Sequence, residues 1–255
     1  MKPDSLTPDG CAEKIRRAER IAVLTGAGVS TSAGVPDFRG PRGLYVTRTY
    51  DPETVFDIDY FDRDPAPFYA FSRDFLALLE KISPTPAHRF LARLEAAGRD
   101  IGIVTQNIDG LHQRAGSRRV YPIHGDYRTA HCRRCGRECG GDELAARLKA
   151  SPETPRCGCG GVVKPDVVFF GEGVRHLEES FSLAAHSDLM LVLGSSLAVH
   201  PAASLPRHAG GEIIVVNRGE VALAPGKGIF LIEAGLDEFF AEVEKSLQAD
   251  ARPKP

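Results

Sequence analysis

Two close pairs of cysteines carry the most specific chemical signal in the sequence. Cys132 and Cys135 form a C-x2-C pair, and Cys157 and Cys159 form a C-x-C pair further along the chain. Two such pairs on separate turns can surround a zinc ion with four thiolates. A zinc ion with four protein ligands has no open coordination position, so we expect a structural ion. Cys139 lies between the pairs and could compete as a ligand.

A glycine-rich segment near the N-terminus has the features of a phosphate-binding turn. Gly26 and Gly28 occupy the first two glycine positions of the dinucleotide-binding fingerprint, whereas Thr31 occupies the third. Glycines let backbone amides approach a pyrophosphate, and the N-terminus of a following helix attracts its charge. A tight turn between a strand and a helix would show the same pattern. Three side chains of the next loop could close over a bound cofactor: Asp37, Phe38 and Arg39.

Polar residues follow a second apolar stretch, at the position where open α/β sheets bind ligands. Gln106, Asn107 and Asp109 come directly after Ile101–Thr105 and could hydrogen-bond ribose hydroxyls and a carboxamide. An Asx-rich turn that caps the next helix would look the same. His124 follows a short apolar stretch and is a candidate general base, because imidazole titrates near neutrality. A single histidine is more often structural than catalytic.

Short runs of consecutive apolar residues predict the strands that position these side chains. Many of their residues are β-branched, as in strands that are covered on both faces of a parallel sheet. The runs are Ile21–Thr25, Ile101–Thr105, Leu189–Leu193, Ile213–Val216 and Ile229–Ile232. Helical patterns fall between them, for example at Phe90, Leu91 and Leu94. This alternation predicts a doubly wound α/β sheet.

Two stretches interrupt the alternation of strands and helices. Residues 41–85 are rich in Pro, Asp, Tyr and Phe, with one helical pattern, and residues 126–164 hold most of the cysteines. We expect both stretches to be insertions that pack beside the sheet as a smaller unit.

The composition excludes several classes of protein. With 255 residues, 42% hydrophobic and 26% charged, the chain is neither disordered nor collagen-like. The formal net charge of −2 gives no global sign of a nucleic-acid or membrane partner. The apolar runs are far shorter than a membrane span, and we find no secretory signal, so we expect a cytoplasmic protein. The arginine-rich segment from Arg114 to Arg137 could attract acidic partners or could be a solvated face.

Taken in order, these motifs resemble those of the sirtuins, a family of NAD-dependent protein deacylases. The resemblance runs from about Ala12 to Val243. It rests on GAGVSTSAGVPDFRG, TQNIDGLHQRAG, the HG at His124, CRRC with CGC, KPDVVFFGE, LGSSLAVHPAA and the VVN that ends at Asn217. It implies a Rossmann-like domain (1–40, 86–125 and 165–255) and a small domain made of a helical insertion (41–85) and a zinc ribbon (126–164). NAD and an acyl-lysine peptide would enter the cleft between the domains from opposite sides.

The resemblance also implies which residues form the site. The NAD-binding residues would be Gly26, Ala27, Gly28, Ser30, Thr31, Asp37, Phe38, Arg39, Gln106, Asn107, Ile108, Asp109, His124, Gly194, Ser195, Ser196, Asn217 and Ala234. The substrate peptide would add as a strand to a segment that contains Val167, Val168, Phe169, Gly171 and Glu172. One structural zinc ion would be bound by Cys132, Cys135, Cys157 and Cys159.

The implied reaction couples amide cleavage to the glycosidic bond of NAD. The acyl oxygen would attack the ribose C1′ as nicotinamide leaves, while Asp109 holds the carboxamide and Asn107 orients ribose or water. His124 would then deprotonate a ribose hydroxyl that attacks the acyl carbon. The products would be deacylated lysine, nicotinamide and O-acyl-ADP-ribose. We expect a monomer that requires neither nucleic acid nor a membrane.

The same resemblance bears on which acyl group the protein removes. Sirtuins that prefer succinyl or malonyl groups carry Tyr-x-x-Arg on the small-domain helix, whereas here Tyr69 is followed at that spacing by Ser72. Arg73 is one position late, and one residue turns a helix by about 100°, so we expect it to point away from the acyl pocket. Acetyl or longer apolar groups are therefore expected.

Two other functions remain as alternatives to the deacylase. One is an NAD-dependent protein ADP-ribosyltransferase, and the other is a non-enzymatic NAD-sensing or nucleic-acid-binding zinc-ribbon protein.

Overall fold

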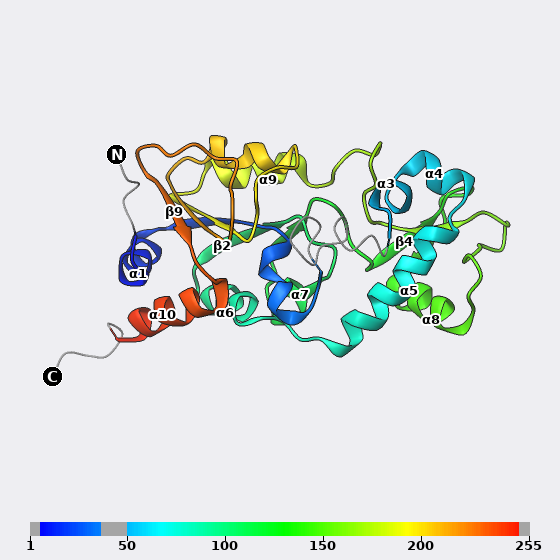
Figure 1. Ribbon diagram of the computed structural model, residues 1–255, viewed down its shortest axis with the longest axis horizontal. Helices are drawn as coiled ribbons and strands as arrows, with labels where there is room; N and C mark the ends of the chain where they lie inside the picture. The colour runs from blue at the N-terminus through cyan, green and yellow to red at the C-terminus, as the bar shows by residue number, and fades with distance from the viewer. Residues whose placement is uncertain (1–5, 37–49, 250–255) are drawn as a thin grey trace.

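A six-stranded parallel sheet forms the larger part of the computed structural model, which describes residues 6–36 and 50–249 (Figure 1). Its strands lie in the order β3-β2-β1-β7-β8-β9, which is the Rossmann order. They span Arg20–Thr25 (β1), Asp100–Thr105 (β2), Val120–Pro122 (β3), Leu189–Leu193 (β7), Glu212–Asn217 (β8) and Ile229–Glu233 (β9). All of the strands predicted from apolar runs are present, so the predicted doubly wound α/β fold is confirmed.

Helices cover both faces of this sheet, which explains the consecutive apolar residues in its strands. Because successive side chains of a strand point to opposite faces, Ile21 and Val23 contact one set of helices, and Ala22 and Leu24 contact the other. The first set is α1 (Pro8–Arg17), α6 (Pro86–Ala96) and α10 (Leu236–Ala249). The second is α9 (Leu177–Ala185) with the 3-10 helix η3 (Ala202–His208). Figure 1 shows the two sets on either side of the strands.

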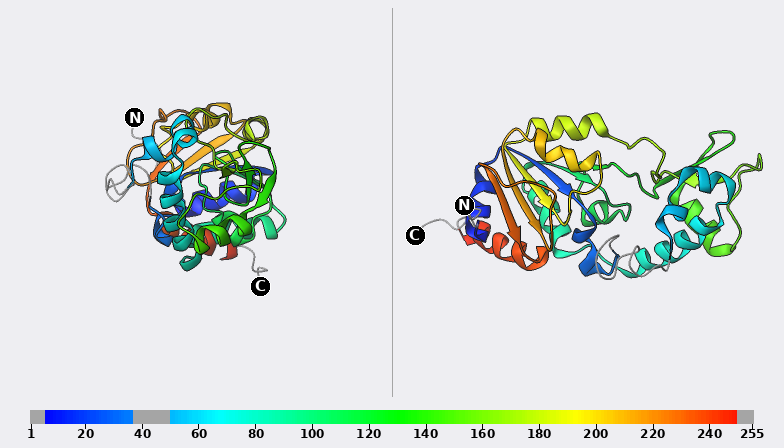
Figure 2. Two further views of the ribbon diagram at one scale, coloured as in Figure 1. Left: turned by 90° about the vertical axis from the view of Figure 1, so that its right-hand side faces the viewer. Right: turned by 45° about the horizontal axis from the view of Figure 1, so that its top comes forward.

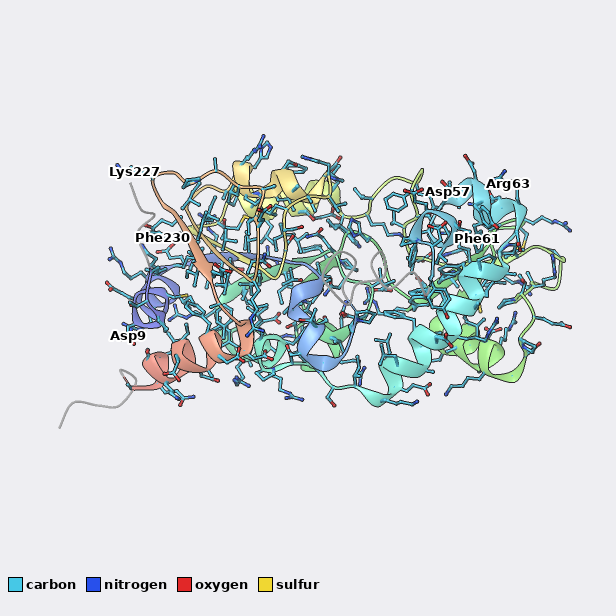
Figure 3. All side chains as sticks on the ribbon, viewed as in Figure 1. Asp9, Asp57, Phe61, Arg63, Lys227 and Phe230 are labelled. Atoms are coloured by element: carbon cyan, nitrogen blue, oxygen red, sulfur yellow. The ribbon has the colours of Figure 1, made fainter. Side chains whose placement is uncertain are left out.

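A smaller unit lies at the other end of the molecule (Figures 1 and 2). It consists of an antiparallel sheet in the order β5-β4-β6 and several helices. Its elements are α3 (Pro52–Val55), α4 (Ile58–Arg63), α5 (Ala66–Lys81), β4 (Thr129–Cys132), β5 (Glu138–Gly140), α8 (Gly141–Ala150) and β6 (Val163–Pro165). Its core is aromatic: the Phe61 ring packs edge-on against Phe68 and Phe169, with centroids 5.5 and 5.3 Å apart. Figure 3 labels Phe61 within this group of helices.

Backbone hydrogen bonds tie the smaller unit to the segment that follows β6. The Phe170 N–H donates to the Phe56 carbonyl at 2.7 Å, and the Ile58 N–H donates to the Phe170 carbonyl at 3.1 Å. The next residue back, Phe169, is buried in the aromatic core. The segment 167–172 is therefore fixed on its small-unit side.

Among the helices in the described parts of the chain, none is both long enough and apolar enough to cross a bilayer.

Candidate active site

The predicted NAD-binding residues gather at the carboxyl ends of the parallel strands. They follow β1 (26–31), β2 (106–109), β3 (His124), β7 (194–196) and β9 (Ala234), and Asn217 is the last residue of β8. Neighbouring strands β1 and β7 mark the point where the strand order reverses, and open α/β sheets bind ligands outside the carboxyl ends of the strands at such a point. The remaining three predicted residues, Asp37, Phe38 and Arg39, lie outside the described residues.

The glycine-rich turn after β1 does not lead into the predicted α-helix. Two short 3-10 helices follow instead, η1 (Ala27–Val29) and η2 (Thr31–Ala33), and Gly34 ends the second with a φ of +98°. The Thr31 hydroxyl donates to the Gly28 carbonyl at 3.1 Å. Serine and threonine hydroxyls compete for backbone groups in this way, which disfavours a regular helix. The expected helix N-terminus is therefore absent from this described turn.

The glycines of this turn allow two backbones to meet at the centre of the sheet. The Gly28 N–H donates to the Gly194 carbonyl at 2.9 Å. A Cβ atom on Gly28 would lie 2.7 Å from the Gly194 Cα, and one on Gly26 would lie 2.7 Å from the Gly194 carbonyl oxygen. Such distances are too short for any side chain. The glycines are thus required by the contact between the β1 and β7 loops, independently of any phosphate.

A hydrogen-bonded group of three side chains links the β1 and β2 loops. The Asn107 amide donates to the Gly26 carbonyl and to Ser30 Oγ, both at 3.1 Å. The Ser30 hydroxyl donates to Asp109 Oδ2 at 2.6 Å, and the Leu111 N–H donates to Asp109 Oδ1 at 2.9 Å. Burial raises the pKa of Asp109, while the hydrogen bonds from Ser30, Leu111 and Asn107 act in the opposite direction. The three side chains are thereby held in one fixed arrangement.

His124 is held by the same loop that carries Asn107. Its Nδ1 lies 2.9 Å from the Gln106 carbonyl oxygen, which can only accept, so Nδ1 carries the proton and Nε2 keeps a free lone pair. Burial lowers the pKa of His124, with the Gln106 hydrogen bond opposing it, so the ring is neutral near pH 7. The Gln106 side chain reaches across to the β7 loop and donates to Ser195 Oγ at 2.9 Å. A neutral imidazole with a free nitrogen can accept a proton.

The predicted peptide-binding segment lies directly against His124. The Val168 N–H donates to the His124 carbonyl at 2.8 Å. The close approach explains the glycine after His124, because a Cβ on Gly125 would lie 1.7 Å from the Asp166 carbonyl oxygen. Within the segment, the Glu172 carboxylate accepts hydrogen bonds from Lys164 Nζ at 2.8 Å and from the Phe169 N–H at 2.9 Å. These bonds fix the turn at the end of the segment.

The four paired cysteines form one cluster. All four Sγ atoms lie within 4.8 Å of one another, with Cys132 3.5 Å from Cys159 and Cys135 3.8 Å from Cys157. A tetrahedron with Zn–S bonds of about 2.3 Å has edges of about 3.8 Å, so the cluster could hold a metal ion of this kind. Cys139 is not a member, because it is buried among the aromatic and aliphatic side chains of the small unit.

Comparison with known proteins decides the family. The sequence matches the Sir2 family over residues 26–201. The chain belongs to the Sir2 family. The NAD-dependent protein deacetylase of Sulfolobus acidocaldarius is 40% identical over 241 residues, covering 93% of this chain and 94% of that protein. The NAD-dependent protein deacetylase of Thermotoga maritima is 43% identical over 212 residues, covering 81% and 85%.

Solved Sir2 structures share the fold of this sirtuin over almost its whole length. One Sir2 enzyme structure aligns with a TM-score of 0.85 and 37% identity, covering 95% of this chain and 98% of that one. Another, a Sir2 protein with a deacetylated peptide and 3′-O-acetyl-ADP-ribose, aligns with a TM-score of 0.84 and 36% identity, covering 94% and 98%. The α/β sheet and small antiparallel sheet of this sirtuin are therefore those of its family.

Sequence reasoning missed a buried polar cluster beneath the site. The Thr25 hydroxyl is hydrogen-bonded to both Thr105 and His112, and His88 packs its ring on His112. The available signal was the polar side chains at the ends of two otherwise apolar strands, but a threonine there also suits a strand surface.

Removing one sulfur from the cysteine cluster should release its metal ion. Cys135 is exposed, so substituting Cys135→Ser would change stability by only about ±0.5 kcal/mol in the absence of a metal. If the cluster binds zinc, we expect the bound metal to be lost and the thermal midpoint to fall by several degrees, because metal binding contributes to folding. Elemental analysis and thermal unfolding measure both. Cys139→Ala should keep the metal; retention of metal by Cys135→Ser would contradict the assignment.

Proposed function

We propose that this sirtuin transfers the acetyl group of an acetyl-lysine side chain to the ADP-ribose part of NAD, with release of nicotinamide. The protein is an NAD-dependent protein deacetylase of the sirtuin type. The observation that carries the residue assignment is the fixed arrangement of His124 beside the Asn107–Ser30–Asp109 group. It combines a proton acceptor with amide and carboxylate groups at the edge where such sheets bind nucleotides.

NAD would lie across the carboxyl ends of β1 and β7. Its phosphates would face the turn that contains Ala27 and Thr31, and the residues Gly194, Ser195 and Ser196 of the opposite loop. Asn217 and Ala234, at the ends of the next two strands, would face the adenosine half. This placement is supported by the strand order, in which β8 and β9 follow β7 on one side of the switch point. The ends of β8 and β9 therefore lie at the same edge of the sheet as the β7 loop. The Asn217 amide is already oriented by the Arg218 carbonyl at 3.1 Å.

Asn107, Asp109 and His124 would carry the chemistry. When NAD is bound, its glycosidic bond supplies an electrophilic carbon for the acyl oxygen. Asp109 would accept a hydrogen bond from the nicotinamide carboxamide, and Asn107 would orient the ribose. His124 Nε2 would take the proton from a ribose hydroxyl, because Nδ1 is already occupied by the Gln106 carbonyl.

The acetyl-lysine peptide would add along the segment Val167–Glu172. Sir2 proteins have been solved with an acetylated peptide and with a peptide and NAD. The N–H groups of Val168, Phe169, Phe170 and Glu172 already donate within the protein. Within the described residues this leaves the Gly171 N–H as the free donor of residues 168–172, so we place the first backbone contact to the peptide there.

The small unit would complete the cleft. We propose that residues 41–85 and 126–164 form one domain, which a zinc ion on Cys132, Cys135, Cys157 and Cys159 stabilises. The backbone at Gly161 packs directly against one of the four sulfurs, because a Cβ there would lie only 2.6 Å from Cys132 Sγ. This close packing around the cluster supports a structural role for the four cysteines. Because the ion would have four sulfur ligands, it would hold the fold and take no part in the reaction.

Replacing His124 tests its role as the base. His124→Ala should lower the deacetylation rate by about 10²- to 10⁴-fold, the usual contribution of a general base, while NAD still binds. The measurement is peptide mass together with nicotinamide release and NAD titration. His186→Ala, at the exposed residue that directly follows α9, is the control and should keep full turnover. Near wild-type turnover in the His124 variant, or ADP-ribose added to the target, would refute the assignment.

The pH dependence of the reaction provides a second test. His124 must be neutral to accept a proton, and burial lowers its pKa, so protonation switches the base off only at acidic pH. We expect kcat/KM to be constant above about pH 6.5, the ordinary value for histidine, and to fall below it. A fall that begins clearly above that pH would show that His124 is not the base or is not buried during turnover.

The acyl preference follows from the small-domain helix α5. Ser72 stands where a guanidinium would be needed, and its buried hydroxyl is 2.9 Å from the Tyr127 hydroxyl. Tyr69 is also fully buried and donates to the Val163 carbonyl. A carboxylate on the acyl chain would therefore find no cation at this pair, and acetyl-lysine should react faster than succinyl-lysine in the same peptide. Initial rates on the two peptides measure this, and faster desuccinylation would contradict it.

A further inference from the structure

A cluster of buried polar side chains lies beneath the loops of the proposed NAD site. Its members are Thr25, Thr85, His88, Thr105 and His112, and none is more than 3% exposed. They come from the ends of β1 and β2, from α6 and the residue before it, and from α7 (Leu111–Ala115). Thr85 and His88 form the capping box of α6, which stabilises that helix. The hydrogen bonds of Thr25, Thr105 and His112 serve no helix cap and lead to the loop after β2.

One arm of the cluster leads to the backbone of Asn107. The Thr25 hydroxyl donates to Thr105 Oγ1 at 2.8 Å, and His112 Nε2 lies 3.0 Å from Thr25 Oγ1. Because the Thr25 proton is directed to Thr105, His112 Nε2 carries a proton and donates to Thr25. Thr105 Oγ1 also accepts the Asn107 N–H at 3.1 Å. The Asn107 backbone is thus bonded to an oxygen whose position depends on Thr25 and His112.

The other arm holds His88 and reaches the β1 loop. The Thr85 N–H lies 3.2 Å from His88 Nδ1, and Thr85 Oγ1 lies 2.7 Å from the same nitrogen. The Thr85 hydroxyl donates to the Val29 carbonyl at 3.1 Å. Burial lowers the pKa of His88 to about 3 and that of His112 well below its ordinary value, so both rings are neutral near pH 7.

The rings of His88 and His112 pack against each other, with their centroids 4.5 Å apart. Among the described residues, His88 Nε2 and His112 Nδ1 are buried without a hydrogen-bond partner. His112 is therefore held by its Nε2 bond to Thr25 and by the packing of its ring on His88.

We propose that Thr25 and His112 are positioning residues for deacetylation, which they support by fixing the backbone of Asn107. Asn107 in turn places its amide between the Gly26 carbonyl and Ser30 Oγ. This inference rests on the proposed role of Asn107. A displaced Asn107 would slow the reaction of bound NAD, whereas NAD would keep its contacts with the β1, β7, β8 and β9 loops. The effect should therefore fall on kcat and spare the KM for NAD.

Two substitutions at Thr25 separate the hydrogen bond from packing. Thr25→Val keeps the shape and removes the hydroxyl, and Thr25→Ser keeps the hydroxyl and removes a methyl group. We expect kcat to fall by about 10- to 100-fold in Thr25→Val with little change in the KM for NAD, and Thr25→Ser to restore most of the rate. Steady-state kinetics with an acetylated peptide and thermal midpoints of all three proteins provide the readout.

Two results would overturn the inference. One is a kcat for Thr25→Val within about twofold of the wild type. The other is an equal loss in both variants that follows their thermal midpoints, which would indicate packing alone. If Thr25→Val does not fold, His112→Gln, whose amide can donate to Thr25, is compared with His112→Leu, which cannot, and the same contrast applies. An inactive wild-type enzyme would instead refute the proposed function.

Discussion

The site depends on the contact between two backbones where the order of the large sheet reverses. Gly28 and Gly194 meet through an N–H to carbonyl bond of 2.9 Å, with no room for a side chain on either. This contact sets the separation of the β1 and β7 loops. Asn107 and Gln106, from the loop between β2 and α7, then bond to Gly26 and Ser195 on opposite sides of it. Three loops from distant parts of the sequence are thereby held in one arrangement.

The second constraint is the junction between the large sheet and the small unit. The segment after β6 is bonded to His124 on one side and to Phe56 on the other, so the proposed base and the proposed peptide-binding segment share a backbone hydrogen bond. The small unit has one modest aromatic core, and clusters of this size are commonly stabilised further by a metal. The four cysteines would give such an ion four sulfur ligands and no open position, which suits a structural role.

Burial has different consequences for the ionisable groups of this protein. It raises the pKa of Asp109 but leaves the carboxylate with donors from Ser30 and Leu111. It lowers the pKa of His124, which keeps the imidazole neutral and able to accept a proton. It keeps His88 and His112 neutral too, in the buried polar cluster beneath the loops. The same physical effect thus acts on the proposed base and on the proposed support below it.

The sequence by itself determined the sheet and the family, and it predicted the site residues at the edge where the parallel strands end. Apolar runs, polar residues after them and paired cysteines are local patterns, and the carboxyl ends of parallel strands must share an edge. Only the tertiary structure decided three points. The glycines of the turn serve a contact with Gly194, the segment after Val29 forms 3-10 turns in place of a helix, and Cys139 belongs to a core. The first and the third depend on neighbours far away in the chain, and a local pattern carries no information about which distant atoms will lie within a few ångströms.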